Sequence, residues 1–307
     1  MKRHNVTLNI GSVALIDKVN GRFGLFDSLF DSLTGRAKCL KETVKLLVYN
    51  RLGKCVSINR LNSVYPVELF EYLGFKKKPG NRTFYRNLER VGNKYKFVLE
   101  KYQGLLKKHD LISEKQFVDF SSSYFEGGKS LLGELGYSRD HEPGKKQIVF
   151  GISTGINQVP TALTVQKGNV QDKKHFKFML RMSKKVLDVG SVLIFDCGAN
   201  TKANKAKVRK LNFHYLTLKP KKKDSYKAYI KKFKEQKQEK IIINNIEYGC
   251  VKFVEENEIK YVFYSEKLAE EQKKKRRKKF MKELEKNEAK LRKTKKGKPL
   301  AKYLSLP

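Results

Sequence analysis

The sequence predicts a mixed α/β protein in which a helical N-terminal region precedes a five-stranded mixed sheet and a smaller β-rich segment. Apolar residues recur at helical spacing over residues 12–112. From residue 113, short β-like runs and helical runs follow in the order β-β-β-α-β-α-β. Beyond Lys219 the chain becomes strongly basic and then supplies three further β-like runs. The predicted domains are 1–112, 113–219 and 220–307.

The charge of the chain indicates a polyanionic partner. The 307 residues are 39% hydrophobic, enough for packed cores, and carry a net charge of +37. Nucleic acid is the default partner for such a surplus, and an anionic membrane surface is the alternative. A membrane-spanning helix needs about 18 consecutive apolar residues, and the sequence contains no such run. The N-terminus lacks the apolar stretch of a signal peptide. We therefore expect a soluble, cytoplasmic protein.

The four cysteines, Cys39, Cys55, Cys197 and Cys250, stand far apart in the sequence. None forms a C-x-x-C pair, which argues against a structural zinc site and against a disulfide framework. The five histidines form no ligand pattern either. We expect free, buried thiols in a reducing compartment.

The N-terminal region is predicted to consist of short helices with tight turns. In residues 37–52 the apolar positions fall at i, i+4, i+7 and i+8, which predicts a helix with one apolar face. The residues of that face are Leu40, Val44, Leu47 and Val48.

Two further short helices are marked by their ends. One begins near Pro66 and stops at Gly74. The next has Asn81 or Thr83 as its N-cap and ends at Gly92. Such helices suit a DNA-binding module of the helix-turn-helix kind, and a plain helical bundle with a solvated basic face is an equal alternative.

Three β-like runs open the central region, at residues 116–125, 147–156 and 159–168. A loop rich in Gly, Pro and charge joins the first two, and a gap of hairpin length joins the second to the third. The first three strands should therefore be consecutive and antiparallel.

A helix and a buried strand are predicted next. Residues 172–190 form an amphipathic helix with Asp172 as its N-cap. Its apolar face comprises Phe176, Met179, Leu180, Ser183, Val186 and Leu187. The run Val192–Phe195 is unbroken and apolar, as expected of a strand covered on both faces.

The remaining elements follow from the same patterns. A second helix is predicted within residues 200–211 and a fifth strand from His214. Residues 241–266 hold three strands, and a long charged helix runs from Glu266 to Arg292. That helix contains the basic run 273–279. Such a run is usually a solvated face, and phosphate contact is the other interpretation. The candidate DNA-binding residues are Lys273, Lys274, Lys275, Arg276 and Arg277.

Two aspartates occupy positions that suggest chemistry. Asp119 lies inside the first strand, and Asp196 lies at the C-terminal end of the fourth. Strand ends are where α/β proteins place their sites. Two acids near a core repel each other unless a divalent cation lies between them, and oxygen ligands favour Mg²⁺ or Mn²⁺. On so basic a chain, such a pair suggests metal-dependent phosphodiester chemistry. Taken singly, each acid is more often structural, as an edge residue or a helix N-cap.

Several stretches of the central region resemble DDE transposases of the insertion-sequence type, from the insertion-sequence-four-like group with a β-rich insertion between its second and third acids. The stretches are "VDFSSSYFEG", "LGYSRDHEPGKKQIVFGI", "VPTALTVQKGNVQDKKHF", "VLIFDCGANTKAN" and "YVFYSEK". The match covers roughly residues 110–300. The resemblance implies a ribonuclease-H-like fold in which strands one and four are adjacent.

The same resemblance implies residue roles. Asp119 and Asp196 match the first and second catalytic acids, which hold Mg²⁺ or Mn²⁺. The small side chains of Ser121–Ser123 would leave room for a DNA backbone. Residues with lesser implied roles are Asn169 and Asp172, which position the site or cap a helix, and Asp140 and His141, in a loop that could contact DNA.

The third acid of the family, a glutamate on a helix after the insertion, is not matched. Glu266, Glu270 and Glu271 occur at the exit of the insertion, too early and in the wrong setting. We therefore expect a chain truncated at its C-terminus, which binds DNA but does not complete strand transfer. The resemblance implies a transposase that binds transposon ends as double-stranded DNA, with a homodimer as one oligomeric state.

Two alternatives to that function remain. One is a non-catalytic DNA-binding remnant of a transposase. The other, remoter one is a structural nucleic-acid-binding protein without transposon ancestry.

Overall fold

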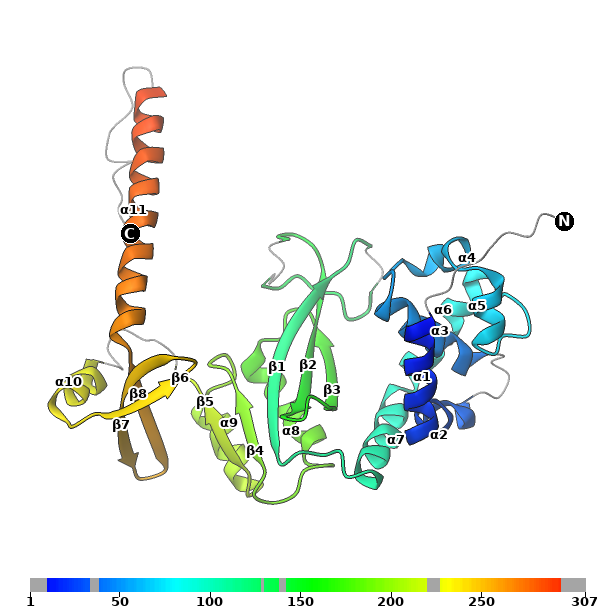
Figure 1. Ribbon diagram of the computed structural model, residues 1–307, viewed down its shortest axis with the longest axis horizontal. Helices are drawn as coiled ribbons and strands as arrows, with labels where there is room; N and C mark the ends of the chain where they lie inside the picture. The colour runs from blue at the N-terminus through cyan, green and yellow to red at the C-terminus, as the bar shows by residue number, and fades with distance from the viewer. Residues whose placement is uncertain (1–9, 34–38, 128–129, 138–141, 220–226, 294–307) are drawn as a thin grey trace. The chain divides into compact units, whose positions relative to one another are not determined.

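The computed structural model describes residues 10–33, 39–127, 130–137, 142–219 and 227–293 (Figure 1). The chain divides into two compact units, residues 1–220 and 221–307. The first unit contains a helical N-terminal region followed by a mixed sheet, which confirms the predicted fold class. The predicted domain boundary near residue 112 lies inside this unit and stays a prediction.

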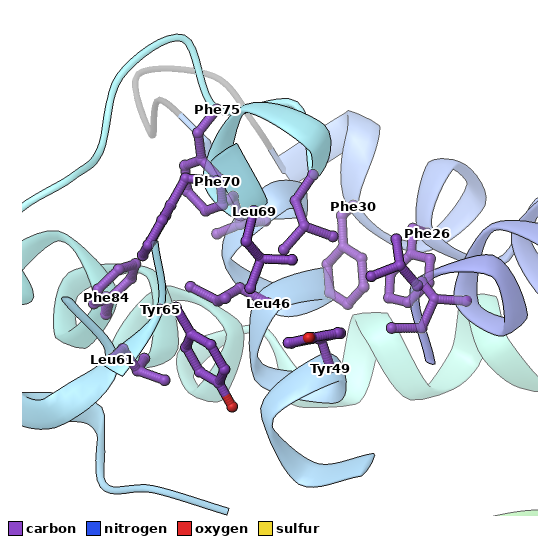
Figure 2. Close-up of a cluster of buried hydrophobic side chains, with 14 of the residues drawn as sticks. Phe26, Phe30, Leu46, Tyr49, Leu61, Tyr65, Leu69, Phe70, Phe75 and Phe84 are labelled. Atoms are coloured by element: carbon purple, nitrogen blue, oxygen red, sulfur yellow. The ribbon is translucent and has the colours of Figure 1, made fainter. Parts of the chain in front are cut away.

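The helical region has its own apolar core. Its helices are α1 (Ile10–Phe23), α2 (Leu25–Phe30), α3 (Leu40–Leu52), α4 (Leu61–Val64), α5 (Val67–Tyr72), α6 (Asn81–Asn93) and α7 (Tyr95–Lys108), with 3-10 turns at Asp31–Leu33 and Ile58–Arg60. Phe70, Phe84 and Leu46 are fully buried together in the core (Figure 2). This close packing positions α6 against α3 and α5.

The buried face of α3 differs from the predicted one. Val48 is exposed, and the helix buries Thr43 and Asn50 beside Leu40 and Leu46. Both polar side chains are hydrogen-bonded: Asn50 Nδ2 donates to Val56 O (2.9 Å), and Thr43 Oγ1 donates to Cys39 O (2.7 Å). A buried polar side chain is tolerated when it has hydrogen-bond partners. The buried face of α3 therefore could not be predicted from the apolar residues alone.

The ends of α5 and α6 are close to those predicted. Pro66 precedes α5, and Gly74 follows it with φ +97°, a left-handed conformation that glycine adopts easily. The N-cap of α6 is Gly80, so neither predicted cap residue was correct, and the helix continues through Gly92. Residues 73–80 separate the two helices, longer than the turn of about three or four residues in a helix-turn-helix.

The sheet of the first unit has the strand order β3-β2-β1-β4-β5 (Figure 1). Its strands are β1 (Lys115–Tyr124), β2 (Gln147–Gly155), β3 (Pro160–Lys167), β4 (Val192–Phe195) and β5 (His214–Thr217). β2 is antiparallel to β1 and β3, whereas β4 is parallel to β1 and β5. The predicted order of elements is confirmed, as is the adjacency of strands one and four.

One face of this sheet is covered by α8 (Asp172–Ser183) and α9 (Lys202–Lys210). The core between sheet and helices includes Phe120, Leu193 and Phe176, all at most 2% exposed. Alternation along each strand sends the intervening side chains to the opposite face.

The opposite face of the sheet is apolar and remains half-buried or exposed. Its residues include Phe117, Phe150, Ile152, Leu163, Ile194 and Leu216. Leu216 is 59% exposed, and Val192 and Ile194 are half-buried. Among the described helices of the first unit, α8 and α9 both pack on one side of β4, so the predicted cover on its second face is not found there.

The second unit contains α10 (Lys227–Glu235), β6 (Glu239–Ile243), β7 (Ile246–Glu255), β8 (Glu258–Tyr264) and α11 (Glu266–Lys293). The three predicted strands are present, and they form an antiparallel sheet in the order β6-β7-β8. A small core of Phe233, Val251 and Phe253 joins α10 to one face of this sheet.

All four cysteines are free thiols. Cys250 is buried and Cys39 half-buried, whereas Cys55 and Cys197 are exposed, so the expectation of buried thiols was wrong for those two. Burial raises the pKa of the Cys250 thiol. Within the described ranges, no helix has the length and apolar character needed to cross a membrane.

Candidate active site

The two predicted acids lie at neighbouring positions on adjacent strands. The parallel ladder between β1 and β4 ends with Val118 beside Phe195. Asp119 is the next residue of β1, and Asp196 directly follows the last residue of β4. Neighbouring strands are about 4.8 Å apart, so the two carboxylates can approach one ion. Both residues are exposed. Asp119 alternates with buried Val118 in β1 and so belongs to the uncovered face, whereas Asp196 directly follows the end of β4. The expected nearness to a low-dielectric core is not observed.

Backbone amides orient both carboxylates. Asp119 Oδ1 accepts a hydrogen bond from the N–H of Phe120 at 2.8 Å. Asp196 Oδ1 accepts one from the N–H of Gly198 at 3.0 Å. A hydrogen bond to one carboxylate oxygen restricts the rotation of that side chain. The pair is therefore held in place by main-chain groups of its own strand ends.

A third acid, Asp172, lies close to Asp196. A Cβ atom placed on Gly198 would be 2.8 Å from Asp172 Oδ2 and 3.2 Å from Asp196 Oδ1. Both carboxylates thus border the same small volume, which only glycine at position 198 leaves open. Asp172 is the first residue of α8 and Gln171 its N-cap, so the predicted capping role is wrong.

Asn204 connects the two elements that carry Asp172 and Asp196. This side chain on α9 is 2% exposed. Its Nδ2 donates to Lys173 O at 3.1 Å, in the first turn of α8, and to Ala199 O at 2.9 Å, in the loop after β4. One buried amide therefore fixes the start of α8 relative to that loop. Asn204 is not among the residues predicted from the sequence, because a lone asparagine in a basic helix forms no recognisable pattern.

The loop after β4 is also tied to β5 and the residues that follow it. Thr217 Oγ1 donates to Asp196 O at 3.1 Å, and Asn200 Nδ2 donates to Leu218 O at 2.8 Å. Thr201 caps α9 by accepting from the N–H of Asn204 at 3.1 Å. These hydrogen bonds hold the loop from Asp196 to Thr201 against β5 and the start of α9.

The other residues implied by the resemblance are placed differently. Ser121 and Ser123 alternate with buried Ser122, so only these two share the face of Asp119. Asn169 is exposed in the turn before α8. Asp140 and His141 lie outside the described residues.

The donor set of the pair suits an oxygen-preferring cation. Asp119 and Asp196 offer carboxylate oxygens, the ligand type that Mg²⁺ and Mn²⁺ prefer. In the part of the chain that the structure describes, no group of three or more His, Cys, Asp or Glu side chains could hold a metal ion. The geometry therefore suits a cation with two carboxylate ligands, whose other positions are filled by water or substrate.

The predicted DNA-binding run lies on α11 of the second unit. Residues 273–279 are all exposed. Because successive helix residues are about 100° apart, seven of them surround the whole circumference. The run therefore presents charge in every direction rather than along one face. Glu266, Glu270 and Glu271 lie in the first turns of the same helix.

Comparisons with known proteins return distant structural likenesses. No family model matches the chain, and no curated protein matches it either. One similar structure is a piggyBac transposase synaptic complex with hairpin DNA, at 11% identity and a TM-score of 0.39, covering 74% of this chain and 51% of that one. Another is a Mos1 transposase paired-end complex with the left transposon end, at 11% identity and a TM-score of 0.25, covering 63% and 70%. The chain spans about half the length of the piggyBac transposase chain.

Proposed function

We propose that this chain is a transposase-type protein that binds double-stranded DNA and cleaves its strands with the help of Mg²⁺ or Mn²⁺, without completing strand transfer because the third acid of the family is not matched. The observation that supports the proposal is that Asp119 and Asp196 directly follow Val118 and Phe195, the last pair of the parallel β1–β4 ladder. The resemblance of the surrounding sequence to insertion-sequence transposases supports it.

Asp119 and Asp196 would hold the cation between their carboxylates. A bound divalent ion in such a site activates a water or a 3′-hydroxyl and stabilises the leaving oxygen of a phosphodiester. The chain itself supplies orientation: the N–H of Gly198 donates to Asp196 Oδ1, and the N–H of Phe120 donates to Asp119 Oδ1. By the resemblance, the small side chain of Ser121, on the same face as Asp119, would leave room for a DNA backbone. No nucleophilic side chain is needed for this chemistry.

The affinity for DNA would come mainly from charge. The net charge of +37 favours binding to a polyanion through release of condensed counterions. The basic run of α11, with Lys273, Lys274, Lys275, Arg276 and Arg277 exposed, would add phosphate contacts to those of the first unit.

The decisive experiment uses the full chain and a labelled duplex that carries candidate element ends. Mn²⁺-dependent nicking that is lost in Asp119→Asn supports the proposal. The matched control is Asp188→Asn, an exposed acid in the turn before β4, which should leave the products unchanged. Tight binding without cleavage in either metal overturns the catalytic part and leaves the alternative, a DNA-binding protein without strand chemistry. Light scattering on the same sample tests the expected homodimer.

A further inference from the structure

The outward face of α6 carries a continuous stripe of polar side chains. Arg82, Tyr85, Arg86, Glu89 and Asn93 fall at i, i+3, i+4, i+7 and i+11, and all are exposed. This spacing places them on one side of the helix. Arginine, glutamate and asparagine are the side chains that pair with guanine, cytosine and adenine edges in the major groove. The exposed side of α6 therefore presents side chains that can pair with base edges, aligned along one side of the helix.

The opposite side of α6 is anchored rigidly. Phe84 is fully buried, with its ring centroid 6.4 Å from that of Phe70 on α5 (Figure 2). Asn87 is 3% exposed, and its Nδ2 donates to Thr43 Oγ1 at 2.8 Å and to Cys39 O at 3.2 Å. These contacts fix the rotation of the helix, so the stripe faces solvent in a defined orientation.

The beginning of α6 is held by a second set of polar contacts. Asn81 Nδ2 donates to Asn59 O at 3.0 Å, and the hydroxyl of Tyr85 donates to Asn59 Oδ1 at 3.0 Å. Asn62 Nδ2 reaches both Asn81 Oδ1 and Pro79 O, at 3.0 and 2.8 Å. The first turn of α6 is thereby joined to the 3-10 turn that precedes α4. Preorganised side chains lose less entropy on binding.

The segments next to α6 add positive charge. Arg60 is exposed directly after Asn59, and Lys76 and Lys77 are exposed in the loop that leads into the helix. Together with Arg82 and Arg86 they outnumber Glu89, the one acid of the stripe. This charge is complementary to the phosphates on both sides of a DNA groove.

We propose that α6 is the helix with which this chain reads duplex DNA, lying in the major groove with its stripe toward the base edges. An α-helix with side chains is about 10–12 Å wide, and the major groove is about 12 Å wide. Arg82, Arg86 and Glu89 contact bases, whereas Arg60, Lys76 and Lys77 contact phosphates. The inference rests on the DNA binding of the proposed function but not on its metal chemistry.

The test begins with selection of preferred sites by the full chain from a duplex library with a randomised central segment. A preferred sequence is expected. Arg82→Ala and Arg86→Ala should each lower affinity for the selected duplex by about tenfold or more and relax its sequence preference at particular positions. Lys77→Ala should lower the affinity for selected and random duplexes equally. It should also reduce the slope of log K against log salt by about one. The matched control is Arg22→Ala, an exposed arginine on α1, which should change neither.

Two results would overturn the inference. One is the absence of any preferred sequence. The other is a wild-type preference in the folded Arg82→Ala/Arg86→Ala double variant, with folding checked by circular dichroism. The outcome is separable from that of the strand chemistry, since Asp119→Asn should retain the full preference whether or not wild type cleaves DNA.

Discussion

Asp119 and Asp196 directly follow Val118 and Phe195, the last pair of the parallel β1–β4 ladder, and both are exposed. They are separated by 76 intervening residues of sequence that include β2, β3, α8 and β4. Two exposed carboxylates at one strand step repel each other unless a cation lies between them. This relationship leads to the first of five predictions.

Replacement of Asp196 by asparagine should weaken Mn²⁺ binding by on the order of tenfold, because affinity for hard cations follows the number of charged ligands. Calorimetric titration of Mn²⁺ into wild type, Asp196→Asn and Asp188→Asn measures the effect. Asp188 is exposed in the turn before β4, so its variant should bind Mn²⁺ as wild type does. Equal Mn²⁺ affinity in all three proteins would show that Asp196 is not a metal ligand.

Asn204→Ala should both destabilise the first unit and loosen the site. The substitution leaves the carbonyls of Lys173 and Ala199 without this donor, at a cost of about 1–3 kcal/mol. Urea unfolding gives the free energy, and Mn²⁺ titration gives the affinity. Lys207→Ala, on the exposed side of α9, should change neither by much. A loss of stability with unchanged Mn²⁺ affinity would mean that Asn204 supports folding alone.

The two faces of β1 should respond differently to the same substitution. Phe120 is 2% exposed under α8, and its replacement by alanine should cost about 3–5 kcal/mol. Phe117 is 49% exposed on the uncovered face, so Phe117→Ala should cost about 1 kcal/mol or less. Equal costs in urea unfolding would show that this face is covered in solution. Binding of a dye specific for apolar surface, reduced in Phe117→Ala, is the second measurement.

Lys41 should stabilise the helical region in a pH-dependent way. Its Nζ donates to Asp27 Oδ1 at 2.7 Å and to Asp31 Oδ1 at 2.9 Å, and the bond from Lys41 lowers the pKa of Asp27. The Lys41 and Asp27 side chains are 25% and 46% exposed, so after solvent screening Lys41→Met should cost only about 0.5–1 kcal/mol at pH 7.

The sign of the pH dependence follows from the lowered pKa of Asp27. The contribution is fully present above the ordinary value of 3.8 and is lost as pH falls through the lowered pKa. Unfolding free energies of wild type and Lys41→Met should therefore converge in acid. A difference that stays constant down to pH 2 would attribute the effect to packing of the lysine stem.

DNA affinity should depend steeply on salt, and α11 should carry part of that dependence. With several phosphates contacted, the slope of log K against log salt should be on the order of −5 or steeper. Deletion of residues 266–307, or replacement of Lys273, Lys274, Lys275, Arg276 and Arg277 by glutamine, should flatten it. A salt-independent affinity of the wild-type chain would rule out the electrostatic account.

Local sequence patterns were enough to predict the first four strands of the sheet. Alternation and turn residues predicted β1, β2 and β3 as consecutive antiparallel strands. The apolar run ending at Asp196 predicted β4, and the register of β4 against β1 pairs Val118 with Phe195, the residues just before the two acids. These features depend on interactions within a few residues or on short connections, which is why sequence periodicity is enough to find them.

The tertiary structure alone decided which faces are buried. Val192 and Ile194 have the composition of a strand covered twice, yet both helices that follow β3 pack on the other side of the sheet. The same limit explains α3, where hydrogen bonds from partners distant in sequence allow Thr43 and Asn50 to be buried.

The candidate site contains both residues that the sequence predicts and contacts that only the tertiary structure shows. Asp119 and Asp196 could be predicted, since each ends or interrupts an apolar run in the sequence itself. The approach of Asp172 to Gly198, and the bridge from Asn204 to Lys173 and Ala199, could not. Those contacts exist only when α8, α9 and the loop after β4 are packed together, because their geometry is set by long-range packing and leaves no periodic signal in the chain.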